Sequence, residues 1–183
     1  MGEIEARLDR VAPPRDFRGA LARPGDVALI AECKRRSPGA GEIRPGLHPA
    51  ALTRGYESAG AAAISVLTDV EYFGGSMDDL ASVHDAVDLP ILRKDFTLDT
   101  AHVIEARAGG ADAVLLIARI LSDDELARLQ VAATALGIPT DATQTVLLPV
   151  GYTRDAVLRP AKRLPPREVT YWNRWGRGRD SGS

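Results

Sequence analysis

Two lysines end apolar runs of the sequence, at the points where loop residues begin. Lys34 closes the run "VALIAECK", and Lys94 closes the run "PILRK" sixty residues later. If both runs are buried strands, each lysine lies at the carboxyl end of a strand. An ammonium group in that position can hold a phosphate or a carboxylate, or it can act as a general acid.

A glutamate accompanies the first lysine. Side chains alternate between the two faces of a strand, so Glu32 and Lys34 share one face of the first strand, and Lys94 and Phe96 share one face of the third. In a parallel barrel the groups at the carboxyl ends of the strands point into one mouth, so we expect Lys34 and Lys94 to face one cavity. Glu32 is then either an ion-pair partner of Lys34 or a second acid–base group. A single lysine at a strand end is ordinarily a solvated residue, whereas two such lysines and a glutamate also suit a binding site. Spacing alone leaves both interpretations open.

Four apolar runs alternate with four helix-like segments. The runs cover residues 27–34, 61–69, 90–96 and 111–118, and the predicted helices cover residues 48–60, 76–87, 99–110 and 122–137. Pro49 stands at the first position of one helix and Gly60 at its end, where each residue type is favoured. Ser122 and Glu125 form a capping box. Continuous apolar strands between such helices predict a parallel sheet that is covered on both faces.

A faint internal repeat narrows the choice of fold. The segment "GAAAISVL" from Gly60 aligns without gaps with "GADAVLLI" from Gly110, two strand–helix units later. Repetition by pairs of units is typical of a (βα)₈ barrel, because alternate strands share a layer of side chains. A doubly wound open sheet is the alternative. No Gly-x-Gly-x-x-Gly turn follows the first strand, so a dinucleotide site has little support.

Composition limits the classes of function. The chain has 183 residues, 45% of them hydrophobic, which is enough for one domain with a buried core. A net charge of −2 gives no reason to expect nucleic acid or an anionic membrane as a partner. No apolar run is long enough to span a bilayer, charged residues interrupt any signal peptide, and the sole cysteine, Cys33, fits a reducing compartment. We therefore expect a soluble cytoplasmic protein, without a metal site because its three histidines lie far apart.

The character of the sequence changes after Ile138. Residues 139–183 hold 8 basic and 4 acidic side chains, five prolines and both tryptophans, whereas residues 1–138 hold 15 basic and 21 acidic side chains. We divide the chain into an N-terminal extension (1–26), a barrel-like part (27–138) and a Pro/Arg-rich tail (139–183) that we expect to be disordered. Aromatic residues among arginines suit single-stranded nucleic acid, so a non-catalytic module whose basic tail binds RNA or a partner is one alternative.

Four blocks of the sequence resemble a known family. "IAECKRRSP", "GAAAISVLTDVEYFGGS", "PILRKDF" and "GADAVLLIARIL" are similar, in order, to indole-3-glycerol phosphate synthase, and the resemblance covers residues 24–138. It implies an α/β fold of the (βα)₈ TIM-barrel family, of which only about the first four βα units are present. It also implies closure of the indole ring of 1-(2-carboxyphenylamino)-1-deoxyribulose 5-phosphate with loss of CO₂ and water, and no metal or organic cofactor.

The resemblance assigns roles to seven residues. Lys94 matches the general acid that protonates the carbonyl oxygen of the substrate during ring closure. Lys34 matches the lysine at the carboxylate and phosphate region that is implicated in the later dehydration, and Glu32 matches the glutamate coupled to it. The remaining positions are implied to bind substrate: Ser37 near its anionic end, and Phe73, Phe96 and Leu115 in the apolar wall around the anthranilate ring.

Later blocks of the family pattern are not found. A "LVEVH"-like strand with a catalytic glutamate, and "GINNRDL"-like and "ESGI"-like blocks, are expected after Ile138, where the Pro/Arg-rich tail stands instead. We interpret the chain as four βα units joined to a foreign tail, and a shifted reading frame near the codon for Ile138 or Pro139 is a hypothesis that would explain it. Reading the downstream nucleotides in the other two frames tests that hypothesis.

A half barrel has an open sheet edge and an uncovered inner face. We therefore expect self-association through the open edge and impaired synthase activity. A different phosphate-binding barrel enzyme that keeps only the two lysines is a further alternative, which a different product from the same substrate would reveal.

Overall fold

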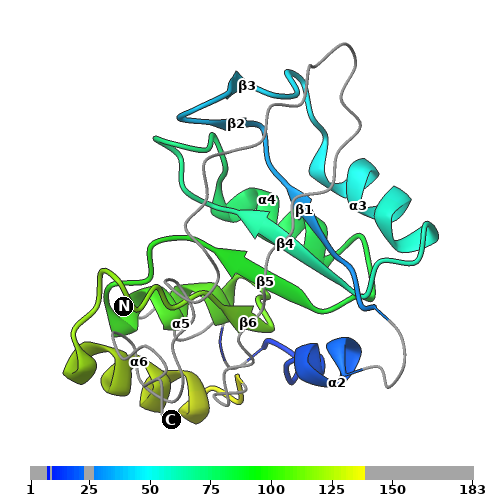
Figure 1. The fold of residues 1–183 in the computed structure, drawn as a ribbon. Helices are drawn as coiled ribbons and strands as arrows, with labels where there is room; N and C mark the ends of the chain where they lie inside the picture. Colours follow the sequence, from blue (N-terminus) through cyan, green and yellow to red (C-terminus); the bar gives the residue numbers. More distant parts are fainter. Residues whose placement is uncertain (1–7, 9, 23–26, 139–183) are drawn as a thin grey trace, which may run out of the picture. The chain divides into compact units, whose positions relative to one another are not determined.

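A four-stranded parallel sheet organises the part of the chain that the structure describes. The computed structural model describes residues 8, 10–22 and 27–138. The strand order is β1-β4-β5-β6 (Figure 1). The strands are β1 (Ile30–Cys33), β4 (Ala63–Leu67), β5 (Ile91–Lys94) and β6 (Ala113–Val114), and each pair of neighbours is parallel.

A helix follows each of these strands. The helices are α3 (Pro49–Ser58), α4 (Met77–His84), α5 (Thr100–Ala108) and α6 (Asp123–Ala135). The starts of α4, α5 and α6 are capped by Ser76, Asp99 and Ser122, whose side chains accept hydrogen bonds from free backbone N–H groups. Helix α3 begins with Pro49 and has no side-chain cap. The capping box of Ser122 and Glu125 is present, as the sequence predicts.

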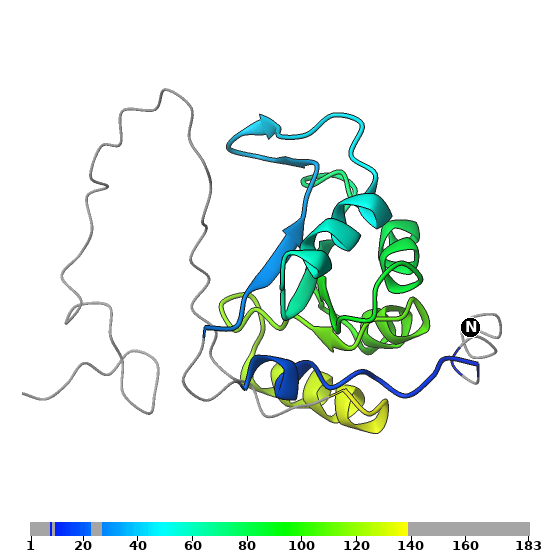
Figure 2. The same cartoon turned by 90° about the vertical axis from the view of Figure 1, so that its right-hand side faces the viewer.

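The helices lie on one face of the sheet, and the core fills the space between. Figure 2 shows α3, α4 and α5 on the same side of the strands, with α6 beside α5. Ile64, Val66 and Ile91 point to this side and pack with Leu80 and Val83 of α4, all of them fully buried. In the described residues no helix covers the opposite face, so the expectation of a sheet covered on both faces is wrong for this part of the chain.

This arrangement decides between the two folds that the sequence left open. A doubly wound sheet carries helices on both faces, whereas four consecutive βα units with every helix outside form part of a (βα)₈ barrel. The described residues therefore have the fold of the first four units of a TIM barrel. The fourth strand is shorter than its apolar run because only Ala113 and Val114 pair with β5.

Three small elements were not predicted. Helix α2 (Phe17–Leu21) lies in the N-terminal extension, and strands β2 (Arg36–Ser37) and β3 (Gly41–Glu42) form an antiparallel hairpin after β1. The extension is tied to the sheet by the buried carboxylate of Asp112. Its two oxygens accept hydrogen bonds from the backbone N–H groups of Arg15 and Ile91, each at 2.8 Å.

Some predictions fall on residues that the structure does not describe. The tail at 139–183, its expected disorder and the reading-frame hypothesis lie outside the described residues, and the division at 26 and 138 stays a prediction. Among the helices that are described, none has the length and apolar character needed to cross a membrane.

Candidate functional site

The carboxylate of Glu32 lies between the two lysines that the sequence singled out. Its Oε1 atom is 2.7 Å from Nζ of Lys34, and its Oε2 atom is 3.8 Å from Nζ of Lys94. Lys34 directly follows β1 and Lys94 ends β5, and both strands pair with β4 between them. Two strand spacings separate β1 from β5 by about 10 Å, a gap that long side chains can bridge.

The three groups carry a net positive charge. Two ammonium groups and one carboxylate leave one unit of positive charge in excess, at the carboxyl end of the strands. Their side chains are only partly exposed, 31% for Lys34, 27% for Lys94 and 22% for Glu32. Attraction to an anion is stronger in such a position than in open water, because less solvent screens it. The cluster is therefore suited to bind a phosphate or a carboxylate.

Phe73 forms one wall beside Lys94. The ammonium of Lys94 lies 5.7 Å from the centre of the Phe73 ring, within the range of a cation–π contact. Phe73 belongs to the loop after β4, which approaches the strand closely at Gly75. A Cβ atom at Gly75 would stand 2.0 Å from the backbone oxygen of Leu67, so only glycine fits there. Asp69 holds the loop by accepting hydrogen bonds from the N–H groups of Tyr72 and Phe73.

The other three sequence-predicted residues lie in the segments that follow β5, β6 and β1. The Phe96 ring follows β5, is 39% exposed, and meets the Tyr72 ring edge-on at 6.2 Å. Leu115 is half-buried just after β6, and its N–H donates to the carbonyl oxygen of Arg93. Ser37 lies in the β2–β3 hairpin, where its hydroxyl accepts a hydrogen bond from the N–H of Ala40. In the described residues no hydrogen bond joins Ser37 to either lysine.

Arg35, which is half-buried, and Arg36, which is exposed, both form hydrogen bonds with other segments of the protein. Arg35 forms a two-pronged ion pair with Asp79 in the first turn of α4, and this hydrogen bonding raises the pKa of Arg35. Arg36 donates to the carbonyl oxygens of Val70 and Glu71, 2.7 and 2.5 Å away. Both arginines thus tie the loop after β1 to neighbouring segments. The short range of sequence patterns could not reveal partners so far along the chain.

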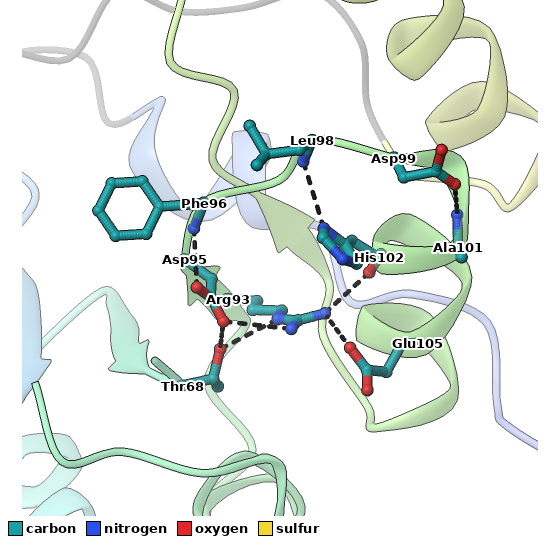
Figure 3. Close-up of polar contacts among 9 residues, drawn as sticks. All are labelled: Thr68, Arg93, Asp95, Phe96, Leu98, Asp99, Ala101, His102 and Glu105. Atoms are coloured by element: carbon teal, nitrogen blue, oxygen red, sulfur yellow. Dashed lines mark hydrogen bonds and ion pairs between the residues drawn. The ribbon is translucent and has the colours of Figure 1, made fainter. Parts of the chain in front are cut away.

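Arg93, the residue before Lys94 on β5, is a buried arginine that the sequence analysis did not identify. The side chain of Arg93 is 8% exposed and points to the helix side of β5 (Figure 3). Its guanidinium donates to Thr68 Oγ1 at 3.0 Å, to Asp95 Oδ2 at 3.1 Å and to the backbone oxygen of His102 at 2.8 Å, and it pairs with Glu105 at 2.9 Å. These bonds fasten the ends of β4 and β5 to α5, which fixes the backbone that carries Lys94.

A cavity of about 350 Å³ adjoins this arginine, outside the lysine cluster. It is lined in part by Asp69, Asp95 and Glu105, but not by either lysine or by Glu32. These three carboxylates already have partners in the protein, because Asp69 and Asp95 accept hydrogen bonds and Glu105 forms an ion pair. We therefore place the candidate site at the lysine cluster and not in this cavity. In the described residues no group of three His, Cys, Asp or Glu side chains is arranged to hold a metal ion.

Comparison with known proteins identifies the family. The sequence model of indole-3-glycerol phosphate synthase matches residues 1–140. The chain belongs to the indole-3-glycerol phosphate synthase family. Proteins with that name from Rhodopirellula baltica and a Nocardioides species are 53% and 50% identical to it over 138 residues, which are 75% of this chain and 53% of each relative.

The match extends over only part of each relative. A synthase from Neisseria meningitidis is 49% identical over 138 residues, 74% of this chain and 53% of its own length. The chain thus spans about half the length of the curated relatives that it matches. A solved mandelate oxidase with benzaldehyde matches 48% of this chain and 36% of its own, but its TM-score of 0.39 and 18% identity are too low to support a conclusion.

Cys33 lies between Glu32 and Lys34 in sequence but faces the opposite side. It is 4% exposed and packs in the core under the helices. Burial, with a smaller contribution from the charge of Asp79, raises the pKa of the Cys33 thiol to about 11. At neutral pH the thiol is protonated and covered, so Cys33 is not a nucleophile of this site.

The raised pKa predicts slow alkylation of the native chain. Two pH units above the ordinary value leave about 100-fold less thiolate at pH 8, so iodoacetamide should modify folded Cys33 at least about 100-fold more slowly than the same chain in denaturant. Because Cys33 is the only cysteine, the mass of the intact chain reports the reaction. Equal rates in native and denatured samples would contradict the buried, protonated thiol.

Proposed function

We propose that this chain supplies the lysine-bearing half of the active site of indole-3-glycerol phosphate synthase. The observation that carries the proposal is the Glu32 carboxylate held between Lys34 and Lys94, at the ends of two strands of a family barrel. The substrate is the phosphorylated anthranilate sugar 1-(2-carboxyphenylamino)-1-deoxyribulose 5-phosphate. We further propose a cytoplasmic location, in keeping with the single free cysteine.

The proposed chemistry needs an acid at the ketone oxygen of the substrate. When the ring carbon that bears the carboxylate attacks the ketone, a carbon–carbon bond forms and the carbonyl oxygen gains the electron pair. The Lys94 ammonium donates a proton to that oxygen, and its fixed position stabilises the developing charge better than water would. Loss of CO₂ returns its bonding electrons to the ring. The new hydroxyl then leaves as water when it receives a proton, and the indole double bond forms as the adjacent carbon of the sugar chain loses a proton to a base.

The other residues bind and orient the substrate. Lys34 holds the anionic groups and supplies the proton for the dehydration, with Glu32 as its partner. Phe73, Phe96 and Leu115 form the wall for the anthranilate ring, and Ser37 lies toward the anionic end. Since the chain spans half of its relatives, we propose that a second half provides the base and most of the phosphate cradle. These residues alone should therefore bind substrate with little or no turnover.

Substrate binding tests the roles of the two lysines. We expect Lys34→Met and Lys94→Met each to weaken binding about 10- to 100-fold, because each removes a charged hydrogen-bond donor. The fluorescence of the anthranilate group gives the dissociation constant, and indole fluorescence in the same samples reports any turnover. Arg54→Met, on the exposed surface of α3, is the matched control for loss of one charge and should have less than about a twofold effect.

The proposed roles of Lys34 and Lys94 would be contradicted if either lysine variant bound the substrate as tightly as the unchanged chain. They would also be contradicted if Arg54→Met weakened binding as much as the lysine variants do. Ordinary turnover by the purified chain would contradict the proposed need for a second half.

We also propose that the chain self-associates through the open part of the half barrel. In the described residues β1 and β6 are edge strands, with one neighbour each. On the face opposite the helices lie partly exposed apolar side chains, among them Leu92 and Leu115. An open parallel edge beside an apolar face is a template for another chain, and pairing would remove both from water.

This proposal predicts a dimer or larger assembly in sedimentation experiments. A charge on the inner face, in Leu115→Glu, should lower the mass toward that of the monomer. Val131→Glu is the matched control because Val131 is 70% exposed on α6, on the helix side of the sheet. A monomer at all concentrations, or dissociation caused by Val131→Glu and not by Leu115→Glu, would contradict association through the inner face.

A further inference from the structure

Two buried polar atoms in the described residues have no hydrogen-bond partner. They are Oε2 of Glu32 and Oγ of Ser65. Ser65 is 3% exposed and lies in the middle of β4. Nζ of Lys94 lies 3.8 Å from the Glu32 atom, which is too far for a hydrogen bond. Both atoms have lost contact with water, and no protein group replaces it.

These two atoms belong to neighbouring positions on the same face of the sheet. Glu32 and Ser65 are direct partners in the β1–β4 ladder, so their backbones are about 4.8 Å apart. The residues on either side of Ser65, Ile64 and Val66, pack in the core under the helices. Cys33, next to Glu32, does the same. By alternation Glu32 and Ser65 therefore point away from the helices, to the face from which Lys94 reaches Glu32.

An unpartnered hydroxyl in this position costs stability unless something binds it. A buried polar atom without a partner destabilises a fold, and an apolar side chain of similar size would not. Two neighbours of Ser65 on the same face are apolar. Leu67 lies two residues further along β4, and Leu92 is the partner of Ser65 on β5. A serine at this position therefore lowers the stability of the fold, and a bound group that forms a hydrogen bond with its hydroxyl would offset that loss.

We propose that Ser65 is a substrate-positioning residue, and that Ser65 Oγ and Glu32 Oε2 together bind one hydroxyl of the sugar chain of the substrate. This rests on the proposed function and names the part of the substrate that the pair holds. A hydroxyl donates to the carboxylate oxygen and accepts from the serine, so both atoms are satisfied at once. A carbonyl cannot donate to Glu32, and a phosphate is repelled by its charge.

Holding a hydroxyl at this point orients the reaction. Glu32 Oε2 lies 3.8 Å from the Lys94 ammonium, so a sugar chain fixed here has its ketone near the proposed acid. Ser65 acts through this placement and takes no part in proton transfer. Its effect should appear in the preference for hydroxylated over plain chains, and not in the binding of the anthranilate or phosphate groups.

The test compares two ligands and two variants. One ligand is the substrate with its ketone reduced to an alcohol, which cannot react; the other is an anthranilate carrying a phosphopentyl chain without hydroxyls. Ser65→Ala should weaken binding of the hydroxylated ligand about 10-fold and leave binding of the plain ligand unchanged. It should also raise the urea midpoint of unfolding, since it removes an unpartnered buried hydroxyl. Ser82→Ala, on the exposed side of α4, should change none of these quantities.

Each other outcome overturns the proposal. If Ser65→Ala lowers stability, or weakens both ligands equally, the serine has a structural role. If it stabilises the chain but leaves both affinities unchanged, the pair holds a water molecule only. If the unchanged chain binds neither ligand, the proposed function itself is wrong. If it binds both ligands equally, only the proposed role of Ser65 and Glu32 is wrong.

Discussion

The candidate site depends on one carboxylate that lies between two ammonium groups. Without Glu32, Lys34 and Lys94 would bring like charges together at the ends of β1 and β5, at a place where solvent only partly screens them. With it, the cluster keeps one excess positive charge and a defined geometry. The parallel sheet makes this arrangement possible, because it aligns the carboxyl ends of strands that are sixty residues apart in sequence.

Polar groups on the two faces of the sheet differ in whether they have hydrogen-bond partners. On the helix side and at the sheet ends, Arg93, Arg35 and Asp112 are held by several hydrogen bonds from the protein itself. On the opposite face, Glu32 and Ser65 each keep a buried atom without a partner. Groups that are fully satisfied fix the backbone, and groups that are left unsatisfied are available to a ligand. This contrast separates the supporting network from the proposed binding surface.

The sequence predicted the repeating units well and the long-range contacts poorly. Apolar runs and capping signals such as Ser122 with Glu125 are local, so all four βα units could be found, and alternation places Glu32 and Lys34 on one face of their strand. The Arg93 network and the Arg35–Asp79 pair join distant segments, for which no local pattern exists. The β2–β3 hairpin is only two residues per strand, and helix α2 is five residues long, too short for a periodic signal.

The most direct test of this account is the NMR spectrum of the chain with its lysines labelled at the side-chain carbon Cε. The chain has three lysines, Lys34, Lys94 and Lys162, so each signal can be assigned by substitution. If Glu32 contacts both strand-end lysines, Glu32→Gln shifts the signals of both Lys34 and Lys94. A spectrum in which the Lys94 signal does not move would contradict the shared carboxylate, and with it the proposed site.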